Sequence, residues 1–195
     1  LIYRHYWLYP KLMKNMKGKG LDIGCGIGDF LRYRPNTIGV DINPETVNWC
    51  KNQGLDVHLM ELDRLPFNEQ SFDSVILDNV LEHIEDDLSI LKSMKNNLNQ
   101  SGKIYLYLPA KMMLWSELDQ MVGHFRRYEP SEIRFKCEQV GLKVIKVHYV
   151  DCLGFFASLL MRLIGYDAEN GIGSIGSLKF YDRWLFPISA FLDKI

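Results

Sequence analysis

The chain has 195 residues, of which 47% are hydrophobic and 24% charged, and its formal net charge is −1. This composition is typical of an ordinary globular domain and excludes a disordered or fibrous chain. It also lacks the overall basic excess of many nucleic-acid-binding proteins, so we expect no nucleic-acid partner.

The cysteines and the hydropathy pattern restrict the class of protein further. Cys25, Cys50, Cys137 and Cys152 are far apart and form no CxxC pair or Cys/His cluster at zinc-ligand spacing. We therefore expect reduced, structural thiols and no metal ion. There is no run of 18 apolar residues and no secretory leader, which predicts a cytoplasmic protein that does not span a membrane.

The first 150 residues alternate β-rich runs with amphipathic stretches, the pattern of parallel strands joined by helical crossovers. Strands are predicted near 19–23, 37–41, 56–60, 73–78, 103–108 and 142–149. Helices are predicted near 28–34, 44–53, 86–99 and 130–140, with Pro44 and Pro130 in first turns. The fold class is thus α/β, with a doubly wound sheet over residues 1–150.

The remaining residues, 151–195, have a different character. Two apolar, helix-like stretches flank the glycine-rich run NGIGSIGS, which predicts a mobile loop. We expect a C-terminal helical appendage of the same domain. Its apolar helices could cover the sheet edge, or they could contact a membrane surface or a partner.

The most informative stretch is LDIGCGIGDF, in which a short strand leads into Gly24, Gly26 and Gly28 and then into a helix. Alternating glycines let the chain turn sharply and let a ligand approach the backbone closely, although a tight structural turn is the alternative. A dinucleotide-binding loop needs a glycine where Asp29 stands, and this carboxylate would repel a pyrophosphate. Asp22, beside the loop, favours a cationic ligand instead.

The next predicted strand, TIGVDIN, ends at Asp41. In a doubly wound sheet this position lies beside the same crevice as the glycine loop. A carboxylate there can accept hydrogen bonds from both hydroxyls of a ribose. Alternatively, Asp41 serves only the start of the helix that begins at Pro44.

With these motifs the sequence resembles the class I, S-adenosylmethionine-dependent methyltransferases, in particular those that act on small molecules. The matching segments are LDIGCGIGDF, GVDIN, MELDRLPFNEQSFDSVILDNVLEHIED and LNQSGKIYLYLP, in the family's order. The resemblance implies a Rossmann-like sheet of strand order 3-2-1-4-5-7-6 and S-adenosylmethionine as cofactor. No run before Ile195 matches the seventh strand, so we expect it to be unrecognised in the glycine-rich tail or missing from the sequence.

The resemblance also implies the residues that hold the cofactor. They are Asp22, Gly24, Cys25, Gly26, Gly28, Asp41, Ile42, Glu61, Leu62, Asp63, Asn79 and Leu81. Glu61 and Asp63 are competing candidates for the adenine amino group, because the run before LPF tolerates length changes. Asp78 and Asn79 fall in the methyl-transfer region and are catalytic candidates, while His83 is either on the substrate side or packed in place.

The segment GHFRRY is similar to the GHxRRY segment of bacterial methyltransferases associated with surface-polysaccharide and glycolipid pathways. His124 is the candidate general base, because the proton affinity of a histidine suits neutral pH, with a purely structural histidine as the alternative. Arg126, Arg127 and Tyr128 are predicted to bind an anionic acceptor. One arginine could instead pair with an acidic neighbour: Glu117, Asp119 or Glu129.

The sequence therefore predicts an enzyme that transfers a methyl group to a small, anionic acceptor such as a sugar, a glycolipid or another metabolite. The acceptor could be lipid-linked, and the protein could then be peripheral at the inner face of the membrane. Two alternatives stay open, a nicotinamide-dependent oxidoreductase and a methyltransferase-like domain that binds without catalysis.

Overall fold

The computed structural model describes residues 4–61, 65–164 and 174–193. Its sheet has five strands in the order β3-β2-β1-β4-β5, and every neighbouring pair is parallel. The strands are β1 (Gly20–Ile23), β2 (Thr37–Asp41), β3 (Val57–Leu59), β4 (Phe72–Asp78) and β5 (Leu98–Tyr107). The chain starts in the middle of the sheet, runs to one edge and returns to the other, which confirms the doubly wound fold and the first five positions of the predicted order.

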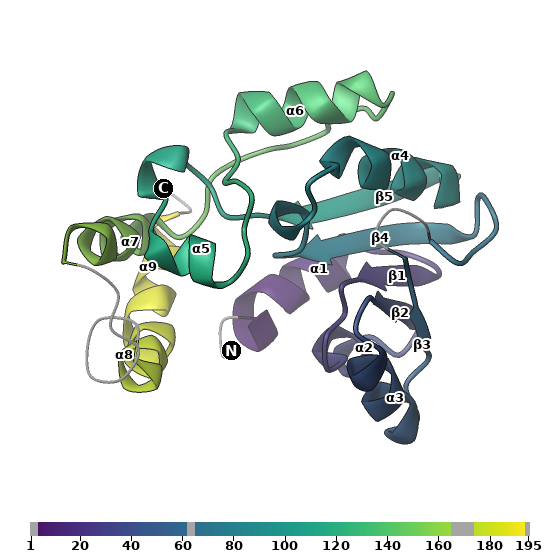
Figure 1. The fold of residues 1–195 in the computed structure, drawn as a ribbon, viewed down its shortest axis with the longest axis horizontal. Coiled ribbons are helices and arrows are strands. Elements are labelled where there is room, and N and C mark those ends of the chain that lie inside the picture. Colours follow the sequence, from purple (N-terminus) through teal and green to yellow (C-terminus); the bar gives the residue numbers. More distant parts are fainter. Residues whose placement is uncertain (1–3, 62–64, 165–173, 194–195) are drawn as a thin grey trace.

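Helices cover both faces of the sheet (Figure 1). One face carries α4 (Asp87–Asn97) and α6 (Pro130–Gln139), and the other carries α1 (Tyr9–Asn15), α2 (Asp29–Tyr33) and α3 (Pro44–Asn52). Three short elements follow strand ends, namely η2 (Leu81–His83), η3 (Met112–Leu114) and α5 (Glu117–Met121). The main core lies between β4 and α4, where Val75, Ile90 and Leu91 are completely buried.

All four predicted helices are present, as α2, α3, α4 and α6. Pro44 and Pro130 lie in first turns, as expected. Asn43 explains where α3 begins, because its side-chain oxygen accepts hydrogen bonds from the backbone N–H groups of Glu45 and Thr46.

The predicted strand at 142–149 is wrong. The segment carries no strand assignment, although Leu142, Val144 and Val147 pack against the main core. Alternating apolar residues predict which side of an extended segment packs against the core. A strand also needs a neighbouring strand with which its backbone groups form hydrogen bonds. Among the described residues the sheet ends at β5.

The N-terminal helices were not predicted. The element η1 (Arg4–Leu8) leads into α1, and the Tyr9 ring packs edge-on against Phe30 of α2 with ring centroids 5.0 Å apart. Leu12 and Ile76 join the same buried cluster. This packing brings the start of the chain onto the sheet beside the glycine loop.

The C-terminal residues form α7 (Cys152–Ile164), α8 (Ile175–Phe180), η4 (Tyr181–Leu185) and α9 (Phe186–Leu192). Asp193 and Ser189 tie the ends of this group together, because their side chains accept hydrogen bonds from the backbone N–H groups of Cys152 and Leu153. The first half of the expected glycine-rich loop lies outside the described residues, and α8 begins in its second half. The division of the chain at residue 150 stays a prediction.

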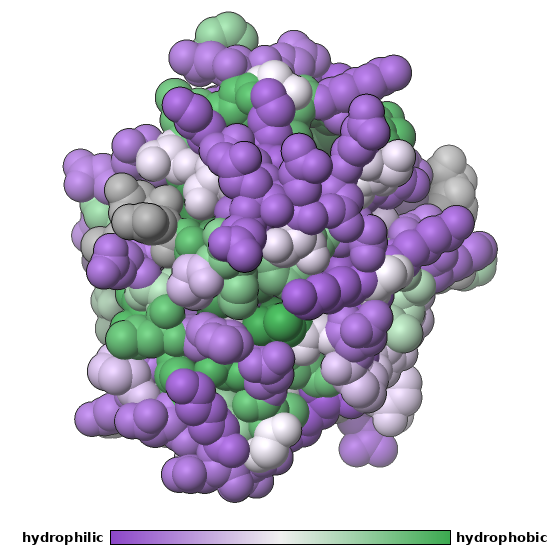
Figure 2. Space-filling model, turned by 90° about the vertical axis from the view of Figure 1, so that its right-hand side faces the viewer, coloured by the Kyte–Doolittle hydropathy of each residue, from purple (hydrophilic) through white to green (hydrophobic). Residues whose placement is uncertain are grey.

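Apolar surface is not confined to the C-terminal helices. The side of the molecule opposite them shows hydrophobic residues across its middle, between hydrophilic residues above and below (Figure 2). None of the helices within the described residues is long and apolar enough to cross a membrane.

Candidate active site

The glycine loop connects β1 to α2, and its glycines have left-handed backbone conformations. Gly24 has φ 69°, and a Cβ atom there would lie 2.6 Å from Cγ2 of Val80, so a larger residue does not fit. Gly26 has φ 52°, and a Cβ atom there would have no other atom within 4 Å. The left-handed conformation explains the choice of glycine at both positions. At Gly26 the loop faces open space, where a ligand can approach the backbone.

Asp41, at the end of β2, holds this loop. Its Oδ2 atom accepts a hydrogen bond from the Gly26 N–H at 2.9 Å, and its Oδ1 atom accepts one from the Asn43 N–H at 2.9 Å. The carboxylate thus bridges the glycine loop and the start of α3. Both roles considered from the sequence, beside the crevice and at the helix start, are compatible with this position.

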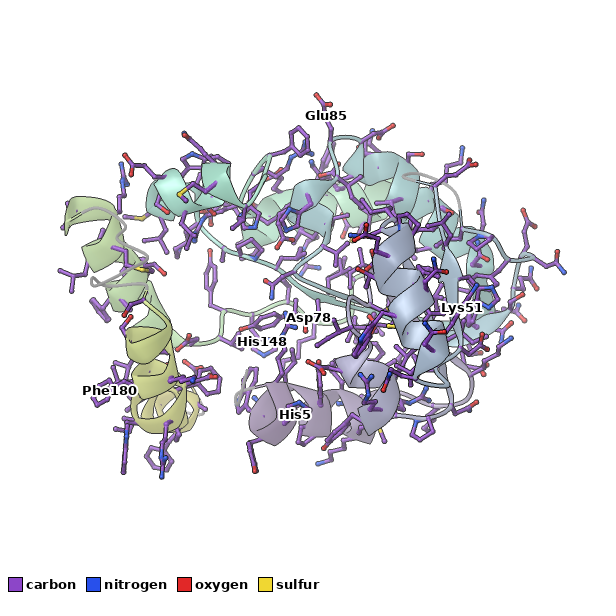
Figure 3. All side chains as sticks on the ribbon, turned by 60° about the horizontal axis from the view of Figure 1, so that its bottom comes forward. His5, Lys51, Asp78, Glu85, His148 and Phe180 are labelled. Carbon is purple, nitrogen blue, oxygen red and sulfur yellow. The ribbon has the colours of Figure 1, made fainter. Side chains whose placement is uncertain are left out.

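A cavity of about 180 Å³ lies at the glycine loop. Its lining consists of Arg4, Tyr9, Asp22, Gly24, Cys25, Gly26, Ile27, Asp29, Phe30, Ile76, Asp78 and Asn79. Figure 3 shows Asp78 in the middle of the molecule, with the N-terminal helix that carries His5 nearby and the C-terminal helix that carries Phe180 farther away. The cavity thus combines the ends of β1 and β4 with the N-terminal segment.

Two carboxyl groups, the buried Asp22 and the largely buried Asp78, line this cavity. Burial raises the pKa of Asp22 well above its usual range, and the neighbouring Asp78 raises it further. Burial likewise raises the pKa of Asp78, against the opposing effect of Arg4, whose Nε atom lies 3.1 Å from Asp78 Oδ2. Carboxyl groups in such a place favour a cationic ligand.

The end of β4 has an unusual backbone conformation. Asn79 has φ 54°, in the left-handed region that asparagine tolerates better than most residues. Its backbone N–H donates to the Tyr107 carbonyl at 2.9 Å, and its side-chain amide donates to Asp78 Oδ1 at 3.0 Å. The amide bond holds the side chain of Asp78, and strained residues of this kind are frequent at ligand sites.

His124 belongs to a second cluster, outside the cavity lining. Its Nδ1 atom lies 2.8 Å from Oδ1 of the buried Asp119. The Nε atom of Arg127 donates to the same Oδ1 at 2.9 Å, and the Ser116 N–H donates to Oδ2 at 2.9 Å. Burial alone would raise the pKa of Asp119, but the hydrogen bonds from Arg127, His124 and Ser116 hold it below the usual value. Asp119 therefore stays ionised and orients His124.

Arg126 and Tyr128 meet at a different carboxylate, the buried Asp87 at the start of α4. Asp87 Oδ2 accepts hydrogen bonds from Arg126 Nη1 at 2.8 Å, Tyr128 Oη at 2.9 Å and Lys136 Nζ at 2.5 Å. Burial raises the pKa of Asp87, and the hydrogen bonds from Lys136, Tyr128 and Arg126 more than offset this and lower it. This network fastens the GHFRRY segment to α4 and α6.

Each arginine of the segment thus has an acidic partner within the chain. Arg127 pairs with Asp119, one of the three partners considered from the sequence, and Arg126 pairs with Asp87, which was not considered. The guanidinium groups hold the segment in place through these pairs. An acceptor that binds the arginines would therefore contact guanidinium groups that are already paired with carboxylates.

The other predicted site residues lie in varied surroundings. Ile42 and Glu61 are exposed beside the sheet edge, whereas Leu81 is completely buried, so Leu81 could contact a ligand only through its backbone. Leu62 and Asp63 lie outside the described residues. The choice between Glu61 and Asp63 therefore stays open.

The sequence did not identify Arg4 and Tyr9 as lining residues of the cavity or Asp87 and Asp119 as anchors of the GHFRRY segment. No motif marks the first pair, which the packing of the N-terminal helices brings to the cavity. The only sequence signal for Asp119 was that it is one of the acidic residues close to the two arginines in the chain.

Comparisons with known proteins agree with this geometry. Residues 21–106 match the methyltransferase domain family. An uncharacterized protein of Methanocaldococcus jannaschii is 34% identical over 90 residues, which cover 46% of this chain and 44% of that protein. The probable tRNA methyltransferase 9B of Mus musculus is 32% identical over 46% of this chain and 21% of its own length. The ubiquinone biosynthesis O-methyltransferase of Haemophilus ducreyi is 27% identical over 64% of this chain and 65% of its own.

Solved structures show the same fold. A SAM-dependent methyltransferase from Archaeoglobus fulgidus has a TM-score of 0.62 at 21% identity and covers 96% of this chain and 87% of its own. The Haloferax volcanii complex of the Trm112 methyltransferase activator with a methyltransferase has a TM-score of 0.65 at 20% identity, over 76% of this chain and 73% of that chain. The chain spans less than two thirds of the length of each curated relative named above. Residues 21–106 match a methyltransferase domain, and the fold is that of S-adenosylmethionine-dependent methyltransferases of known structure.

Proposed function

We propose that the protein transfers a methyl group from S-adenosylmethionine, held at the glycine loop, to an acceptor that enters beside Asp78. The observation that carries this proposal is the pair of buried carboxyl groups, Asp22 and Asp78, in a cavity whose glycine loop is open at Gly26. S-adenosylmethionine carries an ammonium and a sulfonium group, and a cation bound beside these two carboxyl groups would favour their ionised form. Asp29, which also lines the cavity, disfavours the pyrophosphate of a nicotinamide cofactor.

The bound cofactor supplies an activated methyl group, because a sulfonium is a good leaving group. The protein then has to bind the cofactor and the acceptor, align them and exclude water. No covalent link to the protein is needed. In this proposal the Gly24–Gly28 loop and Asp41 hold the cofactor, and the strained Asn79 fixes the Asp78 carboxyl group. A hydroxyl or amine acceptor would also need a base, and His124 stays the sequence-based candidate.

We further propose a small, anionic acceptor. Arg126 and Arg127 carry planar guanidinium groups that can bind a phosphate or carboxylate of the acceptor while they keep their acidic partners in the chain. Their side chains are 22% and 14% exposed. Relatives named as a probable tRNA methyltransferase and a tRNA U34 carboxymethyltransferase favour a second candidate, a tRNA acceptor. The net charge of −1 does not by itself favour this alternative.

Two experiments test the proposed function. Calorimetric titration with S-adenosylmethionine, S-adenosylhomocysteine and NAD should show binding of the first two only. Transfer of labelled methyl groups to separated lipid, small polar metabolite and tRNA fractions then identifies the acceptor. Label in the tRNA fraction would contradict the small-acceptor proposal, and binding without transfer to any fraction would favour a non-catalytic domain.

For the acceptor site itself, Arg126→Lys and Arg127→Lys separate recognition from bracing. If an arginine binds the acceptor, the lysine variant raises the KM for the acceptor and leaves cofactor affinity unchanged. Unchanged acceptor kinetics in both folded variants would exclude these arginines from acceptor recognition.

We also propose peripheral contact with a membrane through the C-terminal helices. Phe156, Leu160 and Leu163 are exposed at helical spacing along α7. Trp184, Ile188 and Phe191 repeat this spacing along η4 and α9, and they too are exposed. Such stripes are typical of helices that lie on a lipid surface.

A further inference from the structure

The cluster around His124 has a feature that the proposed methyl transfer does not use. Glu82 is completely buried, and neither of its carboxylate oxygens has a hydrogen-bond partner among the described residues. A buried carboxylate without partners is costly, so native structures place a donor or an ion beside it. The buried carboxyl group of Glu82 is therefore a candidate ligand for a cation.

Two imidazole rings lie where such a partner would bind. His83 follows Glu82 in η2, and His124 comes from the loop after α5. The two rings are in edge contact, with centroids 4.5 Å apart and planes at 77°. One ligand atom from each of Glu82, His83 and His124 lies within 4.8 Å of the other two.

His124 is already oriented as metal-bound histidines usually are. The Asp119 carboxylate, 2.8 Å from Nδ1, assigns the ring proton to that nitrogen. The lone pair then lies on Nε2, which is 3.8 Å from Glu82 Oε1. Asp119 is itself held by Arg127 and Ser116, so the ring cannot turn without breaking several bonds.

We propose that Glu82, His83 and His124 form a site for one divalent transition-metal ion, with Zn²⁺ as the best-matched occupant. Two imidazole nitrogens and one carboxylate are a common donor set for zinc sites that keep an open position. Bonds of about 2.0–2.2 Å bring the donor atoms of such a site roughly 3.3 Å apart, so the side chains move inward by about 1 Å. His83 is exposed, which leaves an entry path for the ion.

The position of the site has a chemical consequence. Its η2 residues directly follow the end of β4, which carries Asp78 and Asn79 of the cavity. A metal ion on Nε2 of His124 would exclude the general-base role predicted for this residue. The metal site does not depend on the identity of the methyl acceptor, and it is tested without an activity measurement.

The test uses the full chain, stripped of metal with a chelator and titrated with Zn²⁺ against a chromogenic competitor. We expect one Zn²⁺ per chain, bound in the micromolar range or tighter. Glu82→Gln, which keeps the shape of the buried side chain, and His83→Gln should each weaken binding at least tenfold. The matched control is His58→Gln, since His58 is a partly exposed histidine on β3 that pairs with Asp56 away from this cluster; it should bind like the parent.

Co²⁺ gives a second readout that reports the donor atoms. Nitrogen and oxygen ligands give d–d bands without the intense charge-transfer band of cobalt–thiolate bonds, which would place the ion at one of the four cysteines. The thiolate band, the absence of Zn²⁺ binding below millimolar concentration, or unchanged affinity in both folded variants would each overturn the proposal. Circular dichroism and cofactor titration confirm that the variants are folded.

Discussion

The carboxylate of Asp41 accepts a hydrogen bond from the backbone N–H of Gly26 at 2.9 Å and so ties the end of β2 to the glycine loop. Removing it frees the loop and removes the acceptor proposed for the ribose hydroxyls. We expect Asp41→Ala to weaken S-adenosylmethionine binding at least roughly tenfold, or about 1.4 kcal/mol. Calorimetric titration measures this. Asp56→Ala, at an exposed carboxylate just before β3, is the control and should bind like the parent.

Gly26 allows a sharper test, because Gly54 matches it in backbone conformation and in the space around a Cβ atom. Both have positive φ, 52° and 76°, and a Cβ atom at either would have no other atom within 4 Å. Alanine should therefore destabilise both variants by a similar amount, about 1 kcal/mol. Only Gly26 lines the cavity, so only Gly26→Ala should lose cofactor affinity. Equal cofactor affinity in the two variants would show that the ligand does not approach Gly26.

These two residues also show what the sequence could predict. The spacing of the glycines and the acidic end of the next strand are local patterns, and both correctly marked the edge of the sheet where the cavity lies. The segment at 142–149 shows the limit, since its apolar alternation placed Leu142 and Val144 against the core but could not supply a neighbouring strand.

Contacts between distant parts of the chain could not be predicted from the sequence patterns. Arg4 reaches Asp78 only because the N-terminal helices pack on the sheet. Arg126 reaches Asp87 only because the GHFRRY segment folds back over α4. Side chains brought together by tertiary packing leave no periodic signal along the chain.

The Asp87 network predicts a pH dependence of stability. Its three hydrogen-bond donors hold the pKa of Asp87 below the unfolded value of 3.8. The network therefore contributes its full stability above that pH, and the contribution is lost as the pH falls through the folded pKa. Asp87→Asn should lower the free energy of unfolding at pH 7 by roughly 2–3 kcal/mol, because Arg126 and Lys136 lose a charged partner.

Urea unfolding at pH 7 and at pH 3 checks this. The difference between Asp87→Asn and the parent should shrink at the lower pH, where the parent carboxylate begins to take up a proton. Asp56→Asn provides an exposed control with little effect at either pH. A difference that stayed constant between the two pH values would mean that the variant acts through packing and not through charge.

Arg127→Lys should lower thermal stability, because lysine cannot reproduce the planar contact with the buried Asp119. A loss of ~1–2 kcal/mol corresponds to roughly 2–8 °C in Tm for a domain of this size. Arg134→Lys is the matched control, since Arg134 meets Glu138 on the exposed side of α6 at 4.0 Å. Such a surface pair contributes less than about 1 kcal/mol, so its Tm should hardly change. Equal melting temperatures for both variants and the parent would contradict a bracing role for Arg127.

The two exposed stripes of the C-terminal helices predict binding to lipid vesicles. Leu163 on α7 is 75% exposed and Trp184 on η4 is 59% exposed, and apolar side chains at these positions gain free energy by entering the headgroup region. Lys179 and Arg183 precede Trp184 in the same helical segment, which favours anionic over neutral lipid. We expect the parent to float with anionic vesicles in a density gradient, and Leu163→Asp/Trp184→Asp to stay with the unbound protein. Phe135→Asp removes an equally exposed aromatic residue on α6 and should float like the parent. If the parent does not float with either anionic or neutral vesicles, the stripes serve another contact.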